Sequence, residues 1–192
     1  MNYVKEYYQA IQQGDVVVSK KVERVYRFLV DQMNDPQCQY IFDERKADHA
    51  IFFIEHFCKH SKGKQGGKPF LLELWQKALI SAMFGFIDKD TGFRQFREVI
   101  LIVARKNGKS TLGAAIGLYL MVADQEPGAE IYAAATKKDQ AKIIWLEAKR
   151  MVKKSNWLWK KIKCLVAELV SGYNDSTFKP LGSDSDTLDG LN

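Results

Sequence analysis

Glu98-Val-Ile-Leu-Ile-Val-Ala-Arg-Lys-Asn-Gly-Lys-Ser-Thr111 is the stretch that decides the fold of this 192-residue chain. Its apolar run, Val99 to Val103, predicts a buried β-strand, and small residues from Leu112 to Val122 predict a helix. A short polar turn that ends in Gly108-Lys109-Ser110-Thr111 joins the two. A strand, a turn containing Gly-Lys-Ser and a helix, in this order, are typical of a nucleotide phosphate-binding loop.

Each residue at the end of this turn suits a contact with a nucleotide. Gly108 lets the backbone close around a phosphate, and the N-terminus of the following helix points free N–H groups at the anion. Lys109 is placed to reach the β- and γ-phosphates of ATP, and the Ser110 hydroxyl to ligate Mg²⁺. Asn107 and Thr111 complete the expected nucleotide-binding set. The usual first glycine of the motif is replaced by Val103, and the alternative is an ordinary strand–helix turn with a surface lysine.

Two further sites are candidates for contacts with the same nucleotide. Arg105 lies three residues before Gly108, where a guanidinium can stabilise charge on the γ-phosphate in the transition state; the alternative is a solvent-facing loop arginine. Trp75-Gln76 lies upstream, and a glutamine amide offers both a donor and an acceptor to an adenine edge while an aromatic ring packs nearby. The alternative for Trp75-Gln76 is ordinary half-buried helix packing.

Basic residues are concentrated near the C-terminal end of the sequence. The window from Lys137 to Lys163 holds ten lysines and arginines against two acids, and Trp157 and Trp159 lie within it. Part of this window is expected to form a helix up to Lys154 with an apolar stripe, and helical spacing places part of the charge away from that stripe, on a face that can follow the phosphates of DNA. The residues of the apolar stripe are Ala141, Ile144, Trp145, Ala148, Met151 and Val152. The alternative, which the sequence supports equally well, is that the lysines of the window form a solvent-exposed helix face without a DNA partner. The lysines of this face are Lys138, Lys142, Lys149 and Lys153.

Composition is consistent with these expectations. The net charge of +6 and the isoelectric point near 9.1 favour an anionic partner such as nucleic acid. The three cysteines are unclustered, which indicates neither a disulfide framework nor a zinc knuckle. No apolar run approaches the length that spans a membrane, and we expect no membrane partner and a location in a reducing cytoplasm.

Periodicity predicts a helical N-terminal region followed by an α/β part. Helices are expected over 2–13, 20–33, 47–60 and 71–85, a basic glycine-rich linker over 61–69, and a short hairpin over 86–96. The α/β part adds strands over 129–135, 163–170 and 177–181 and a helix from Thr136 to Lys154 that opens with capping-box spacing at Asp139. Strands separated by helices imply parallel order. The expected fold class is α/β, a P-loop NTPase-type parallel sheet flanked by helices, with residues 1–69 as an appendage and 70–192 as the nucleotide-binding part.

The acidic residues that a P-loop hydrolase uses beside its phosphate loop are not found in their usual place. After residue 111, no run of four or five apolar residues is followed by Asp-Glu, the pair that holds Mg²⁺ and orients the attacking water. Asp43-Glu44 follows a short apolar run but precedes the phosphate loop, and we do not assign it this role. Asp184, Asp186 and Asp189 fit a polar turn better than a calcium loop. We therefore expect nucleotide binding with little hydrolysis.

Four ordered segments resemble the large subunit of the terminases of tailed phages, which are DNA-packaging motors. Residues 103–111 resemble a variant Walker A motif that tolerates the loss of the first glycine and carries an arginine in the position of Arg105. Residues 70–76 are similar to the adenine-side glutamine motif of that family. Residues 129–141 are similar to its strand-to-helix segment, and 183–192 to the loop before its Walker B strand. The resemblance extends over about residues 40–192.

The resemblance implies an ATP-driven translocase that packages double-stranded DNA in a bacterial host, with ATP and Mg²⁺ as cofactors. It also implies a terminase small subunit and a portal as partners and a homo-oligomeric ring as the assembled motor. Arg105 and Lys109 are then the catalytic candidates. Family members continue into Walker B, a coupling motif and a nuclease domain, none of which occurs within residues 1–192. The alternatives are a nucleotide-binding or docking remnant without turnover, and an unrelated P-loop kinase.

Overall fold

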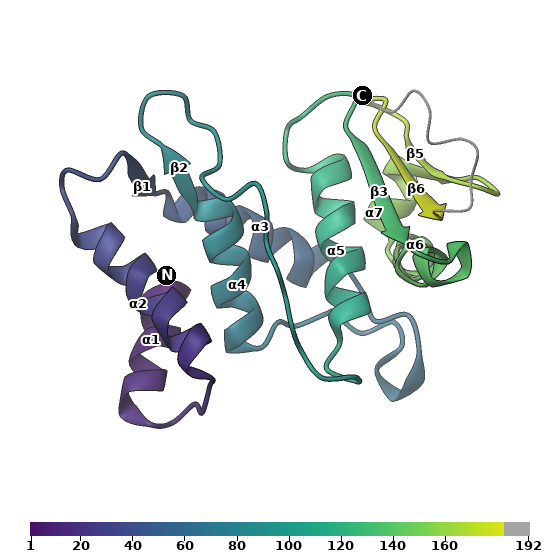
Figure 1. Cartoon of the computed structure of the whole chain (residues 1–192). Helices are drawn as coiled ribbons and strands as arrows, with labels where there is room; N and C mark the ends of the chain where they lie inside the picture. The colour runs from purple at the N-terminus through teal and green to yellow at the C-terminus, as the bar shows by residue number, and fades with distance from the viewer. Residues whose placement is uncertain (183–192) are drawn as a thin grey trace. The chain divides into compact units, whose positions relative to one another are not determined.

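The structure is a computed structural model that describes residues 1–182, with Lys138 described by its backbone alone. The chain divides into two compact units (Figure 1). The first combines Met1–Phe52 with Leu72–Ile102, and the second combines Phe53–Leu71 with the chain from Val103 onward. The sequence suggested a division between residues 69 and 70. Each of the two units contains residues from before and after that point.

The first unit begins with two helices whose ends follow from local capping. Helix α1 (Tyr3–Gln13) starts at Asn2, whose side chain accepts a hydrogen bond from the Lys5 N–H, and ends at Gly14 in the left-handed conformation (φ 81°). Helix α2 (Lys20–Asn34) starts at Ser19, which caps the Val22 N–H. Both helices were expected from the apolar periodicity of the sequence. The caps explain where they begin and end, because cap residues satisfy free N–H groups and glycine adopts positive φ without strain.

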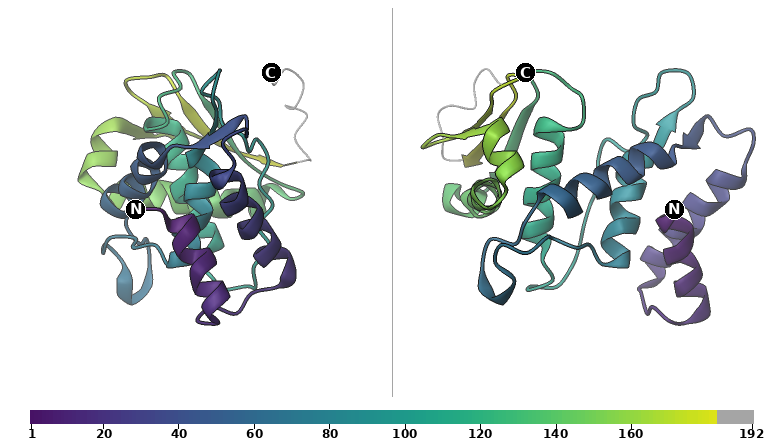
Figure 2. Two further views of the ribbon diagram at one scale, coloured as in Figure 1. Left: turned by 90° about the vertical axis from the view of Figure 1, so that its left-hand side faces the viewer. Right: turned by 180° about the vertical axis from the view of Figure 1, so that it is seen from behind.

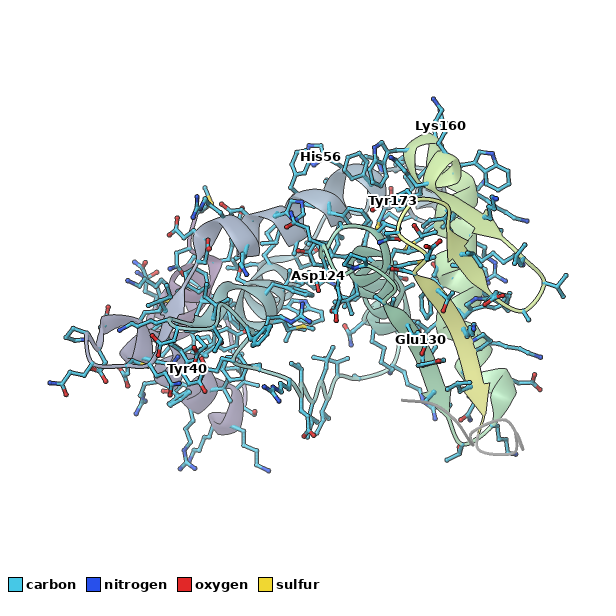
Figure 3. The ribbon with its side chains drawn as sticks, turned by 90° about the horizontal axis from the view of Figure 1, so that it is seen from above. Tyr40, His56, Asp124, Glu130, Lys160 and Tyr173 are labelled. Carbon is cyan, nitrogen blue, oxygen red and sulfur yellow. The ribbon has the colours of Figure 1, made fainter. Side chains whose placement is uncertain are left out.

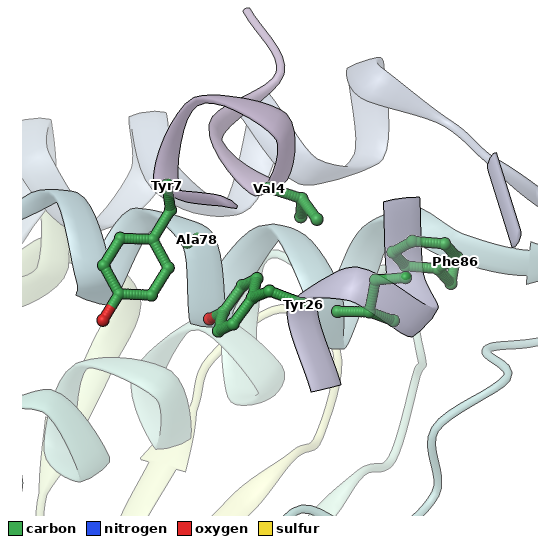
Figure 4. Close-up of a cluster of buried hydrophobic side chains, with 6 residues drawn as sticks. Val4, Tyr7, Tyr26, Ala78 and Phe86 are labelled. Carbon is green, nitrogen blue, oxygen red and sulfur yellow. The ribbon is translucent and has the colours of Figure 1, made fainter. Parts of the chain in front are cut away.

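A small aromatic core joins these helices to the rest of the first unit. Tyr7 of α1 and Tyr26 of α2 meet edge to face with ring centroids 4.7 Å apart. Burial raises the pKa of the Tyr26 hydroxyl far above its usual range. Figure 4 shows this cluster, whose buried members are Val4, Tyr7, Tyr26, Leu29, Ala78 and Phe86.

The remaining elements of the first unit form a two-stranded sheet beside helix α4 (Leu74–Gly85). Strand β1 (Tyr40–Phe42) pairs antiparallel with β2 (Phe86–Asp88), and a single bridge joins Ile87 to Arg94, where a hairpin was expected. Helix α3 (Glu44–Phe57) follows β1 and extends from the first unit into the second.

The second unit is built on a four-stranded mixed sheet in the order β3-β6-β5-β4. Strand β3 (Glu130–Ala135) pairs in parallel with β6 (Thr177–Gly182), whereas β6 with β5 (Leu169–Ser171) and β5 with β4 (Ile162–Cys164) pair antiparallel. The expectation of an all-parallel sheet is therefore wrong. The expected strand over 163–170 is a hairpin, because a turn closed by the Leu165 N–H and the Glu168 carbonyl (2.9 Å) reverses the chain.

Two long helices pack against each other and against β3 and β6 (Figures 1 and 2). Helix α5 (Lys109–Val122) lies over β6 where Gly117 meets the ring of Phe178, and helix α6 (Lys138–Lys154) donates a hydrogen bond from Trp145 Nε1 to the Phe178 carbonyl (3.0 Å). The N-cap of α6 is Lys137, which contributes no side-chain cap, so the N-cap lies one residue after the position expected at Thr136. The short helix α7 (Asn156–Lys161), which the sequence did not predict, follows with Ser155 as its cap.

The prediction of a strand over Val99–Val103 is wrong. These residues form no strand, and Ile100 and Ile102 are 86% and 90% exposed. A strand requires a neighbour for its backbone N–H and C=O groups, and no strand within residues 1–182 pairs with this segment. In the same described part of the chain, no helix is long and apolar enough to span a membrane.

Candidate functional site

The turn that precedes α5 reverses the chain through two residues with positive φ. Lys106 (φ 69°) and Gly108 (φ 71°) both adopt the left-handed region. Asn107 Nδ2 donates to the Ala104 carbonyl (3.3 Å) and braces the turn. Gly108 is the N-cap of α5, and its carbonyl accepts the first helical hydrogen bond, from Leu112 (2.9 Å). The cap contributes no side chain, so the first N–H groups of α5 stay available to a ligand.

The side chains of the expected phosphate site lie at the surface of the second unit. Arg105, Asn107 and Lys109 are exposed, whereas Ser110 and Thr111 are half-buried at the first turn of α5. An exposed lysine and a hydroxyl at a helix N-terminus form an arrangement that can hold phosphate and Mg²⁺. The turn and helix of the motif are thus present, while its expected preceding strand is not.

A cavity of about 290 Å³ opens beside Ser110 and Thr111 within the second unit. Helix α6 supplies one wall with Ile143, Leu146, Glu147 and Arg150. The segment after α3 supplies another with His60, Ser61 and Lys62. The cavity thus joins the hydroxyls of the phosphate loop to a carboxylate and two cationic side chains.

The loop beside this cavity is closed at its base. An antiparallel bridge joins Lys59 to Pro69, and the His60 backbone N–H bonds to the Lys68 carbonyl (3.0 Å). The His60 ring meets Phe70 edge to face at 5.1 Å. Residues 61–69, expected to be a linker, therefore leave and return to the same point, which fixes Ser61 at the cavity.

Glu147 is a site residue that sequence reasoning missed. Its Oε1 accepts a short hydrogen bond from the Ser61 hydroxyl (2.6 Å), and its Oε2 lies 3.7 Å from Arg150 Nη1. The side chain is 14% exposed. A signal was available, since Glu147 is one of two acids in the basic window and lies one helical turn from Ile144 and Met151, at the edge of the apolar stripe.

Trp75 and Gln76 belong to the first unit, at the start of α4. Gln76 is 5% exposed, and its side-chain oxygen accepts a hydrogen bond from the Glu73 N–H (2.9 Å) in a capping box. Trp75 is half-buried against the aromatic core of the first unit. The Gln76 side chain therefore already has a structural role, and the expected adenine contact stays a prediction.

The lysines of the expected DNA face differ in their surroundings. Lys149 Nζ donates to the Leu165 carbonyl (2.5 Å) and lies 4.8 Å from the centre of the Trp145 ring, and Lys142 pairs with Asp139 (3.4 Å). Lys153 is exposed, while the side chain of Lys138 lies outside the described residues. Exposed neighbours extend the charge along α6, α7 and β4, with Lys160 pointing away from the ribbon in Figure 3; they are Lys154, Lys160 and Lys163.

The other acidic candidates are accounted for or lie outside the described residues. Asp43 caps α3 by accepting hydrogen bonds from the backbone N–H groups of Arg45 (2.9 Å) and Lys46 (3.3 Å). Asp184, Asp186 and Asp189 lie outside the described residues, as does the segment 183–192 that carries one of the four family motifs.

The chain is similar to known proteins that are terminase large subunits. The terminase large subunit of Enterobacteria phage HK97 is 35% identical over 108 residues, which are 56% of this chain and 20% of that protein. The crystal structure of the HK97 bacteriophage large terminase matches with a TM-score of 0.65 and 29% identity, covering 76% of this chain and 29% of that one. The chain thus spans less than a third of either relative. A family model described as the ATPase domain of the terminase large subunit matches residues 74–192, and this chain belongs to that family.

Proposed function

We propose that this chain is the ATP-binding portion of a terminase large subunit, the motor that drives double-stranded DNA into a phage procapsid in the host cytoplasm. The observation that carries the proposal is the turn before α5. Its left-handed Gly108, its uncapped helix N-terminus and its exposed Lys109 supply the groups that hold a triphosphate. Membership of the terminase ATPase family supports the assignment to ATP and to DNA packaging.

Each residue that the sequence singled out for nucleotide binding has a distinct proposed role. Lys109 contacts the β- and γ-phosphates, Ser110 ligates Mg²⁺, and Asn107, Gly108 and Thr111 shape the loop around the phosphates. Arg105, exposed at the start of the turn, stabilises charge on the γ-phosphate during hydrolysis. Trp75 and Gln76 contact adenine. The terminase small subunit, the portal and further copies of the subunit in a ring are the proposed partners of the whole motor.

The proposal is tested by Lys109→Ala. We expect this variant to bind ATP and ADP at least about tenfold more weakly in calorimetry, since a hydrogen bond to a charged group contributes roughly 1.5–3 kcal/mol. The matched control is Lys160→Ala, which removes an exposed lysine from α7. Unchanged nucleotide affinity in Lys109→Ala, or an equal loss in the control, contradicts the phosphate-loop assignment.

We further propose that a polypeptide of residues 1–192 binds ATP and hydrolyses it at a rate near background. The support is the sequence after residue 111, where no apolar run is followed by Asp-Glu. Phosphoryl transfer depends on positioned groups around the nucleophile and the metal, and Arg105 and Lys109 alone do not position a water molecule. Steady-state ATP turnover that disappears in Lys109→Ala is the result that contradicts this expectation.

A further inference from the structure

A carboxylate faces the cavity beside the phosphate loop and has no role in the function proposed above. The carboxylate of Glu147 shares the cavity with the Ser110 and Thr111 side chains, and both are carried by the second unit. A nucleotide whose phosphates lie at the N-terminus of α5 has to extend its nucleoside away from that point. The cavity begins there, and its volume of about 290 Å³ is near the lower end of the range for ligand pockets, roughly 300–1,000 Å³.

We infer that this cavity receives the ribose of the bound nucleotide and that Glu147 accepts a hydrogen bond from the ribose 2′-hydroxyl. The inference rests on the proposed nucleotide site and extends it to the sugar. Carboxylates are suited to this contact, since each oxygen accepts more than one hydrogen bond and a sugar hydroxyl is a donor. The apolar side chains of Ile143 and Leu146 line the same cavity and are suited to pack against the sugar carbons.

The surroundings of Glu147 hold its carboxylate in a fixed orientation. Ser61 occupies one lone-pair position on Oε1 at 2.6 Å, and Arg150 approaches Oε2 at 3.7 Å. Because a carboxylate has about four acceptor positions, lone pairs remain for a hydroxyl. Because Ser61 belongs to a loop closed at Lys59 and Pro69, the orientation of the carboxylate is set before a ligand arrives.

The same surroundings favour a hydroxyl over a metal ion as the partner of Glu147. Arg150 and Lys62 bring positive charge to the cavity, and this charge opposes the binding of a metal ion at Glu147. Within residues 1–182, no group of three His, Cys, Asp or Glu side chains is placed to hold a metal. A neutral donor that needs one well-oriented acceptor is the ligand that this arrangement fits.

The inference predicts discrimination between ribonucleotides and deoxyribonucleotides, measured by calorimetry with ATP, 2′-deoxy-ATP and inorganic tripolyphosphate. We expect the unaltered 192-residue chain to bind ATP about tenfold more tightly than 2′-deoxy-ATP, the effect of one hydrogen bond to a charged acceptor. Glu147→Ala should bring the two affinities to within about twofold by weakening ATP alone. Tripolyphosphate, which has no sugar, should bind the variant as it binds the unaltered chain.

Two further variants separate a sugar contact from a general disturbance of the fold. Asp139→Ala removes an exposed carboxylate from the same helix, outside the cavity, and should keep the preference for ATP. Glu147→Gln keeps the shape and an acceptor oxygen but loses the charge, and should show an intermediate preference.

The inference is overturned if the unaltered chain binds ATP and 2′-deoxy-ATP equally. It is also overturned if Glu147→Ala keeps the preference, or weakens tripolyphosphate as much as ATP. Failure of the phosphate site itself has a different signature, since tripolyphosphate then fails to bind the unaltered chain or binds Lys109→Ala equally well.

Discussion

At the scale of single residues, Asp88 shows how one carboxylate organises a turn in the first unit. Its Oδ1 accepts hydrogen bonds from the backbone N–H groups of Asp90 (3.0 Å) and Thr91 (2.9 Å) and from the Thr91 hydroxyl (3.0 Å), and Gln39 donates to its Oδ2 (2.7 Å). These donors, with the Thr91 N–H first, hold the pKa of Asp88 below its ordinary value of 3.8. The ionised form therefore stabilises the folded state.

This carboxylate predicts a dependence of stability on pH. Because the pKa is lower in the folded state, the stabilising effect is present above about pH 4 and is lost as the pH falls through the folded value. We expect Asp88→Asn to lower the thermal midpoint at pH 7 and to narrow its difference from the unaltered chain towards pH 2. Melting curves followed by circular dichroism at several pH values test this, and a difference that stays constant from pH 7 to pH 2 contradicts it.

At the scale of elements, helix α5 approaches the sheet closely because it carries glycines on its packed face. A β-carbon built on Gly117 would lie 2.7 Å from Cε1 of Phe178, a ring that is itself fully buried. The same β-carbon on Gly113 would lie 3.7 Å from Ile144, at an ordinary contact distance. The helix therefore has no room for a side chain at Gly117, whereas it has room for a methyl group at Gly113.

This contrast predicts opposite effects for two alanine substitutions. Gly117→Ala should destabilise the second unit by about 1–3 kcal/mol, because the buried ring has to move. Gly113→Ala should leave the free energy of unfolding unchanged or raise it by up to about 1 kcal/mol, since alanine is the better helix former. Urea unfolding of both variants tests the packing of α5 on β6, and equal midpoints for the two would contradict it.

At the scale of the whole molecule, the net charge of +6 favours an encounter with DNA, but the structure restricts which lysines are available. Lys149 and Lys142 have partners within the second unit, whereas Lys153 and Lys154 are exposed at the end of α6. A contact with DNA phosphates is therefore expected to use the end of α6 rather than its middle.

This distribution of charge predicts a specific salt dependence of DNA binding. Reversing Lys153 and Lys154 together to Glu should reduce the slope of log affinity against log salt by about two, since each phosphate contact contributes about 0.9. Reversing Lys20 and Lys21, which are exposed at the start of α2, changes the net charge by the same amount and is the control. Duplex binding measured by fluorescence anisotropy at several salt concentrations tests the face. Equal slopes in both double variants would show that net charge alone governs binding.

The sequence by itself determined the features that depend on near neighbours along the chain. Helices α1 and α2 follow from apolar spacing and from the cap residues Asn2 and Ser19, and the turn before α5 follows from Gly108. These interactions span about four residues, so a linear pattern contains them. Four ordered motifs likewise sufficed to indicate the terminase family, which the matched residues 74–192 confirm.

Only the tertiary structure decided the features that join distant residues. It made the sheet mixed, turned the expected strand over 163–170 into a hairpin, and left residues 99–103 without a strand partner. It also directed Lys149 to the Leu165 carbonyl and joined Glu147 to Ser61, 86 positions away. The physical reason is that strand pairing and side-chain hydrogen bonds require particular partners in space, whereas periodicity records only which face of an element is apolar.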